Sequence, residues 1–133
     1  GISQLEKINK FVKRRQAIAF QYNQLLSDLP LLPQFNPDTC YSSRHLYVIR
    51  IQTEKVKKAR LQIFQEMRDE GIGVNLHYIP VHTQPYYQEM GFKNGDFPEA
   101  EQYYAEAISL PLYPDLKNEQ IVHVAKTLRN VIN

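Results

Sequence analysis

The chain has few cysteines and no long apolar run. A single cysteine, Cys40, excludes an intramolecular disulfide and favours a reducing, cytoplasmic setting. No stretch of about eighteen apolar residues occurs, and no charged-then-apolar signal segment stands at the start, so neither a membrane span nor export is expected. The chain opens on Gly1 rather than Met, which favours a processed product or a piece of a longer protein.

An excess of charge of one sign is also lacking. Sixteen Lys and Arg residues face fourteen Asp and Glu residues, which leaves a net charge of +2. Binding to a nucleic-acid backbone normally leaves a large positive excess, so nucleic acid is not an expected partner. One basic cluster occurs near the start, and a solvated helix face explains it better than an anionic partner does. The cluster comprises Lys7, Lys10, Lys13, Arg14 and Arg15.

Motifs for catalysis or metal binding are missing as well. The five glycines form neither a Gly-x-Gly-x-x-Gly fingerprint nor a P-loop, and no Gly-x-Ser-x-Gly elbow occurs. Cys40 has no neighbouring group that would activate it as a nucleophile. His77 and His82 lack the spacing of helical zinc motifs, while His45 and His123 fall in predicted regular elements. No catalytic residue and no metal ligand is therefore assigned.

Hydrophobic spacing predicts the element order αβαβαβα. A long amphipathic helix from Gln4 to Leu29 places apolar residues at alternating intervals of three and four. The prolines that follow predict an extended, irregular stretch up to about Ser43. A long loop is expected over residues 80–96. The remaining elements are strands over 45–51, 74–79 and 108–112 and helices over 54–70, 96–107 and 118–132.

Local signals set the expected ends of these elements. Thr53 is expected to cap the second helix, Gly71 to end it, and Asp96 with Glu99 to form a capping box. The strand–helix–strand unit over residues 45–79 implies two strands that run the same way, and the third can insert between them antiparallel.

The predicted fold class is α+β, with a small three-stranded, mainly antiparallel or mixed sheet covered by about four helices. Residues 1–133 are interpreted as a single domain. Within it, residues 1–29 form the first or linker helix and residues 30–133 the small α+β body.

Residues 71–87 have the composition of a ligand-facing segment. Two histidines and three tyrosines lie there, together with an asparagine and a glutamine. Rings with polar tips offer contact area and hydrogen bonds at low entropic cost. An ordered loop packed by its own rings is the alternative, and it stays open at this point. The residues expected to contact a ligand are His77, Tyr78, His82, Gln84 and Tyr86.

Several motifs in series resemble one enzyme family. They are Gly71-Ile72, His77-Tyr78-x-Pro80-Val81-His82-x-Gln84-Pro85-Tyr86-Tyr87, Phe97-Pro98-x-Ala100-Glu101 and Ser109-Leu110-Pro111-Leu112-Tyr113-Pro114. In this order and at these separations the chain resembles the C-terminal small domain of DegT/DnrJ/StrS-type sugar aminotransferases, fold type I enzymes that use pyridoxal 5′-phosphate. Residues 1–15 are similar to the linker helix that leads into that domain.

The resemblance implies a domain that is catalytically incomplete by itself. In that family the cofactor lysine, the carboxylate at the pyridine nitrogen and the phosphate-binding residues belong to an N-terminal domain, so no cofactor is expected to bind to this chain alone. For the full-length parent it implies amino transfer from glutamate to a nucleotide-linked keto-sugar in surface polysaccharide or glycan biosynthesis, by a homodimer. Residues 77–87 would then touch the sugar or the diphosphate.

A second hypothesis belongs to another class of function. The chain would be a free-standing binding or assembly module that holds a macromolecule with its first helix and the 77–87 loop. A reading frame that continues upstream of Gly1 into a lysine-bearing domain would exclude this module. A coiled coil through the first helix is less favoured, because Arg15 lies on its apolar face.

Overall fold

The computed structural model describes residues 2–133 as an antiparallel sheet with helices packed on one face. Strands β1, β2 and β3 span Leu31–Pro33, Tyr47–Ile51 and Ala107–Leu110. Helices α1 to α6 span Ile2–Leu5, Ile8–Leu25, Arg60–Asp69, Pro85–Glu89, Pro98–Glu106 and Asn118–Ile132, and the 3-10 helix η1 spans Val81–Thr83. The predicted α+β class with a small, mainly antiparallel sheet is confirmed.

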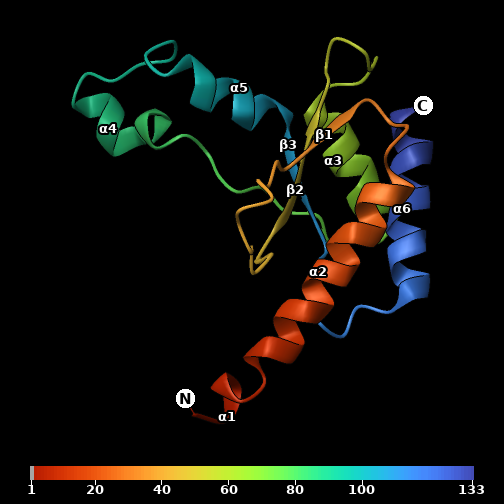
Figure 1. The fold of residues 1–133 in the computed structure, drawn as a ribbon. Coiled ribbons are helices and arrows are strands. Elements are labelled where there is room, and N and C mark those ends of the chain that lie inside the picture. Colours follow the sequence, from red (N-terminus) through yellow and green to blue (C-terminus); the bar gives the residue numbers. More distant parts are fainter. Residues whose placement is uncertain (1) are drawn as a thin grey trace.

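The core lies between the sheet and the helices α2, α3 and α6, which Figure 1 shows grouped together. Alternate side chains of β2 and β3 enter this core, while the intervening ones face the opposite side of the sheet. The second half of α2 is part of the core, whereas α1 contributes no buried residue. The central buried side chains of the core are Tyr22, Tyr47, Ile49, Ile63, Ile108 and Leu128.

The sheet differs from the expectation at both edges. Its order is β1-β2-β3, so the short strand Leu31–Pro33 occupies an edge that the prolines had suggested would be irregular. Pro33 is tolerated there because an edge strand needs no donor on its outer side. The predicted strand over 74–79 is wrong, since it is reduced to one antiparallel bridge between Asn75 and Ser109.

Pairing stops after that bridge. Asn75 exchanges both of its backbone hydrogen bonds with Ser109. The next amide, the Leu76 N–H, donates to the Asn75 Oδ1 atom at 2.8 Å. The predicted topology nevertheless holds at this point. β3 pairs antiparallel to β2 on one side and to Asn75 on the other, so it lies between two segments that run the same way.

Several helix ends also differ from the sequence expectation. The second helix begins at Arg60 rather than near Thr53. The Lys55 N–H donates to the Gln52 carbonyl and closes a turn there, and Ala59 is extended directly before the helix. Asp96 does not cap α5. Its Oδ2 atom accepts the Lys93 N–H at 2.9 Å, and the helix begins at Pro98.

The first helix is interrupted and ends early. A turn separates α1 from α2, and α2 ends at Leu25 rather than at Leu29. Within the predicted loop over 80–96, the short helices η1 and α4 form instead. Among residues 2–133, no helix has the length and apolarity needed to cross a bilayer.

The predicted stop at Gly71 is confirmed. Gly71 has φ +78°, and its N–H donates to the Arg68 carbonyl at 2.9 Å. The Ile72 N–H donates to the Met67 carbonyl at 2.9 Å, and both of these side chains are buried. This is the Schellman pattern, in which the turn satisfies the last helix carbonyls and brings the chain back over the core.

Candidate functional site

Residues 76–97, here called the lobe, lie between the Asn75 bridge and α5. Figure 1 shows α4, at the tip of the lobe, well apart from α2, α3 and α6. The lobe exposes several large apolar or aromatic side chains, an arrangement typical of a contact surface. They are Tyr78, Ile79, Val81, Tyr86, Met90, Phe92 and Phe97.

His77 stands at the base of the lobe, where it leaves the sheet. Its Nδ1 atom lies 2.9 Å from the Oγ atom of Ser109, which is buried on β3. The imidazole itself is half-buried. His77 is therefore anchored to the sheet through one ring nitrogen.

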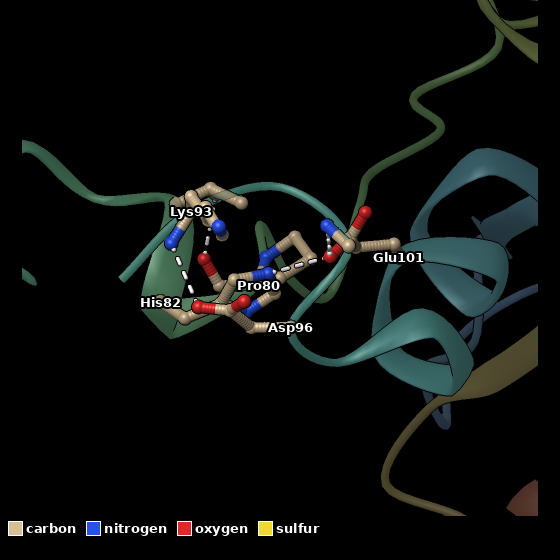
Figure 2. Close-up of polar contacts among 7 residues, drawn as sticks. Pro80, His82, Lys93, Asp96 and Glu101 are labelled. Atoms are coloured by element: carbon tan, nitrogen blue, oxygen red, sulfur yellow. Dashed lines mark hydrogen bonds and ion pairs between the residues drawn. The ribbon is translucent and has the colours of Figure 1, made fainter. Parts of the chain in front are cut away.

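His82 lies inside the lobe. Only 6% of it is exposed, and its Nε2 atom lies 2.8 Å from the Glu101 Oε1 atom (Figure 2). The same carboxylate oxygen accepts the Gly95 N–H at 2.7 Å, and the Phe97 ring packs against the imidazole at 4.8 Å between centroids. His82 thus ties η1 to α5 and to the turn before it.

These contacts change the acidity of Glu101. The Gly95 N–H, and next the His82 side chain, lower the pKa of the Glu101 carboxyl below its usual range. Two further bonds close turns in the same region: Thr83 Oγ1 donates to the Pro80 carbonyl, and Lys93 N–H donates to Asp96 (Figure 2). The lobe is held by its own polar contacts as well as by its rings.

The two tyrosines named from the sequence lie at the surface. Tyr78 and Tyr86 are each 67% exposed. The Tyr86 and Tyr87 rings pack edge to face, with 5.3 Å between their centroids. Gln84 acts through its backbone, because its carbonyl accepts the N–H groups of Tyr87 and Gln88 at the start of α4.

The sequence-predicted residues therefore fall into different environments. Tyr78 and Tyr86 are exposed, His77 is anchored at the sheet edge, and His82 is enclosed. Two polar partners were missed, Ser109 and Glu101, although both lie in the motifs quoted above. Strand alternation could have found Ser109 once its pairing with Asn75 was known, because both then share one sheet face.

The described residues do not fit pyridoxal 5′-phosphate by themselves. The half-buried Lys58 is occupied, since its Nζ atom lies 2.8 Å from Glu66 and 2.7 Å from the Val131 carbonyl. Lys55 donates to Gln52 at 3.1 Å, and no lysine lines the five main grooves found over residues 2–133. In the same part of the chain, no group of three His, Cys, Asp or Glu residues lies close enough to hold a metal ion.

Comparison with known families assigns the chain to a family. The model of the DegT/DnrJ/EryC1/StrS aminotransferase family matches residues 1–129. The chain belongs to this family. Spore coat polysaccharide biosynthesis protein SpsC of Bacillus subtilis (strain 168) is 36% identical over 135 residues, which cover 99% of this chain and 35% of SpsC.

Solved structures of aminotransferases have a similar fold. The sugar aminotransferase assigned as Spr1654 from Streptococcus pneumoniae, in its PLP form, matches with a TM-score of 0.91 and 29% identity over 98% of this chain and 33% of its own. Helicobacter pylori PseC, an aminotransferase involved in the biosynthesis of pseudoaminic acid, matches with a TM-score of 0.89 and 27% identity over 99% of this chain and 35% of its own. The chain spans about a third of the length of the relatives it matches.

Proposed function

We propose that this aminotransferase-family chain is the C-terminal domain of a pyridoxal-phosphate-dependent sugar aminotransferase. The whole protein would transfer an amino group from glutamate to a nucleotide-linked keto-sugar, as a cytoplasmic homodimer that serves surface polysaccharide or glycan biosynthesis. The match over residues 1–129 supports the proposal, as do relatives named for spore coat polysaccharide and pseudoaminic acid biosynthesis.

The domain's own part is to form one wall of the substrate cleft. The observation that carries this role is the lobe, whose exposed rings Tyr78 and Tyr86 stand on a base tied to the sheet. Tyrosine rings can stack on a sugar or a base, and His77 at the base can donate a hydrogen bond to a diphosphate oxygen. His82 and the Gln84 side chain were also expected to contact substrate. The enclosed His82 would affect the substrate through the lobe that it supports, whereas the Gln84 side chain stays a proposed substrate contact.

Pyridoxal 5′-phosphate supplies the electron sink for amino transfer when it is bound. The residues that would hold it lie outside this chain, in agreement with the occupied Lys58 and with the grooves that no lysine lines. The chain alone, mixed with the cofactor, is therefore expected to give no glutamate-sensitive absorbance band. A stoichiometric band would contradict the proposal that the fragment is catalytically incomplete.

The cleft-wall role is tested in the whole protein by Tyr86→Ala and Tyr78→Ala. Loss of an aromatic contact of about 1 kcal/mol is expected to raise KM for the nucleotide sugar roughly fivefold. The half-reaction with glutamate should keep its rate, because glutamate offers no ring to stack. Tyr41→Ala, at a 73% exposed tyrosine beside α2, is the matched control. An unchanged KM in both lobe variants would reject the role.

A free-standing binding module remains the second candidate, and one observation favours it. Ile2, Leu5 and Ile8 are exposed at the start of the chain, which indicates contact with another domain or another chain. A monodisperse complex of this chain with a macromolecule, formed without any cofactor-binding domain, would support the module. Transaminase activity of the whole protein that depends on the lobe would exclude it.

A further inference from the structure

The proposed substrate role of His77 depends on which of its ring nitrogens carries the proton. A neutral imidazole has one N–H donor and one acceptor, and the partner of the first nitrogen decides what the second one offers. In this structure the only polar side chain within hydrogen-bonding distance of the His77 ring among residues 2–133 is Ser109, through Nδ1 at 2.9 Å.

Ser109 is held firmly in place. It is 4% exposed, and its neighbours Ile108 and Leu110 point into the core on the opposite face of β3. Its backbone exchanges two hydrogen bonds with Asn75, at 3.0 and 2.8 Å. His77 follows Asn75 by two residues and so lies on the same side as Ser109, within diagonal reach across the bridge.

The hydroxyl proton of Ser109 has one acceptor in the described part of the chain. The only atom found within hydrogen-bonding distance of Ser109 Oγ is His77 Nδ1. If Nδ1 carried the proton and donated it to Oγ, the buried hydroxyl proton would have no acceptor. Leaving a buried polar group without a partner carries a free-energy cost, so this arrangement is disfavoured.

We infer that Ser109 is a positioning residue that donates its hydroxyl proton to His77 Nδ1 and thereby fixes the imidazole in the Nε2–H form. The Nε2 atom then offers a donor on the side of the ring that faces away from the sheet. Its partner must be a hydrogen-bond acceptor, such as a phosphate oxygen of a nucleoside diphosphate, and not a hydrogen-bond donor. This assignment of ligand chemistry rests on the proposed substrate role of His77.

The tautomer can be measured on the chain itself. Long-range ¹H–¹⁵N spectra of the ¹⁵N-histidine-labelled chain at about pH 8.5, where imidazole side chains are neutral, distinguish the two forms. The His77 signals are identified by their loss in His77→Gln. The expected result is the Nε2–H pattern in the native chain and averaged ¹⁵N shifts in Ser109→Ala, because the donor that biases the ring is gone.

Two further variants make the test specific. Ser109→Thr keeps the hydroxyl and is expected to restore the Nε2–H pattern, and Ser43→Ala, at an exposed serine, should leave it unchanged. The Nδ1–H pattern in the native chain would overturn the inference, even if Ser109→Ala fails to fold. An unchanged Nε2–H pattern in a folded Ser109→Ala chain would overturn it as well.

Kinetics of the whole protein separate this inference from the proposed function. Ser109→Ala is expected to raise KM for the nucleotide sugar about fivefold with little change in kcat, since a lost hydrogen bond is worth about 1 kcal/mol. If Ser109→Ala loses the Nε2–H preference but keeps its KM, the positioning role of Ser109 stands and the substrate role of His77 is rejected. If Ser109→Ala raises KM but the native chain shows no preference for the Nε2–H form, the positioning role is rejected and the substrate role stands.

Discussion

Glu101 shows how one carboxylate organises the lobe. A single oxygen, Oε1, meets both the buried His82 ring and the Gly95 N–H, so η1, α5 and the turn between them share one contact point. Without this carboxylate, the Gly95 N–H would lose its partner. The carboxylate therefore keeps the exposed tyrosines of the lobe on a defined base.

The acidity of Glu101 predicts how the lobe responds to pH. Its folded-state pKa lies below the usual value, so its stabilising contribution is present above the ordinary carboxyl pKa and is lost as the pH falls through the lowered one. The Gly95 amide, which donates to Glu101, should shift as the pH falls below the ordinary carboxyl pKa. Amide NMR follows this directly. In Glu101→Gln, which keeps an acceptor oxygen but cannot ionise, the shift should vanish, and a native Gly95 amide that ignores pH would refute the assignment.

In the core, Tyr22 combines a buried hydrogen bond with aromatic packing. It is fully buried, its hydroxyl donates to the Pro111 carbonyl at 3.1 Å, and its ring lies 5.0 Å from that of Tyr47. Burial raises the pKa of Tyr47 to about 12 and raises that of Tyr22 as well. Neither hydroxyl is therefore expected to ionise below pH 10.

Tyr22→Phe is predicted to lower the free energy of unfolding by about 1 kcal/mol, because the Pro111 carbonyl loses its donor. Urea unfolding followed by circular dichroism measures the change. Tyr41→Phe removes a hydroxyl from an exposed ring and should leave stability unaltered. Equal stabilities for the two variants would show that the buried hydrogen bond contributes nothing.

The roles of individual residues were only partly predictable. The composition of residues 71–87 singled out both histidines, yet nothing local separates His77 from His82. Their environments are set by residues distant in sequence, Ser109 and Glu101, which the pairing of β3 and the packing of α5 bring close. Those partners could be named only after the topology was known.

At the scale of elements, a helix or strand end was predictable where a local residue alone determines it. Gly71 ends α3 because only glycine adopts its positive φ without strain, and the sequence carried that signal. The strand expected over 74–79 is reduced to one bridge, because within that segment only Asn75 exchanges backbone hydrogen bonds with β3. β1 was missed because Pro33 and the preceding Pro30 obscure a strand that exists only through pairing with β2.

The role of Gly71 in ending α3 is tested by comparing Gly71→Ala with Gly73→Ala. With φ +78° the substitution is expected to cost about 1–2 kcal/mol of unfolding free energy, although nothing within 4 Å would obstruct a Cβ atom. Gly73→Ala is the matched control, since that position is equally open and has no positive φ. It should be neutral or slightly stabilising. Chemical denaturation of both variants gives the difference, and equal midpoints would remove the role of the left-handed turn.

At the scale of the whole molecule, two surfaces of the described residues expose apolar side chains. The lobe carries exposed rings on a base of polar contacts. The projecting segment formed by α1 and the start of α2 (Figure 1) carries an apolar stripe of Ile2, Leu5 and Ile8. Between them, α2, α3 and α6 complete a closed core. The fold thus exposes two apolar surfaces beside its closed core, as expected for the proposed cleft wall of a larger enzyme.

The apolar stripe should make the isolated chain self-associate. Ile2, Leu5 and Ile8 are 78%, 65% and 49% exposed, and burying them against a second copy removes apolar surface from water. Light scattering is expected to give a mass that rises with concentration. Leu5→Gln combined with Ile8→Gln should return the chain to a monomer, whereas Val122→Gln, at a 46% exposed residue on α6, should not. A strict monomer at high concentration would show that the stripe does not drive self-association. It would also weaken the hypothesis that the stripe packs against another domain.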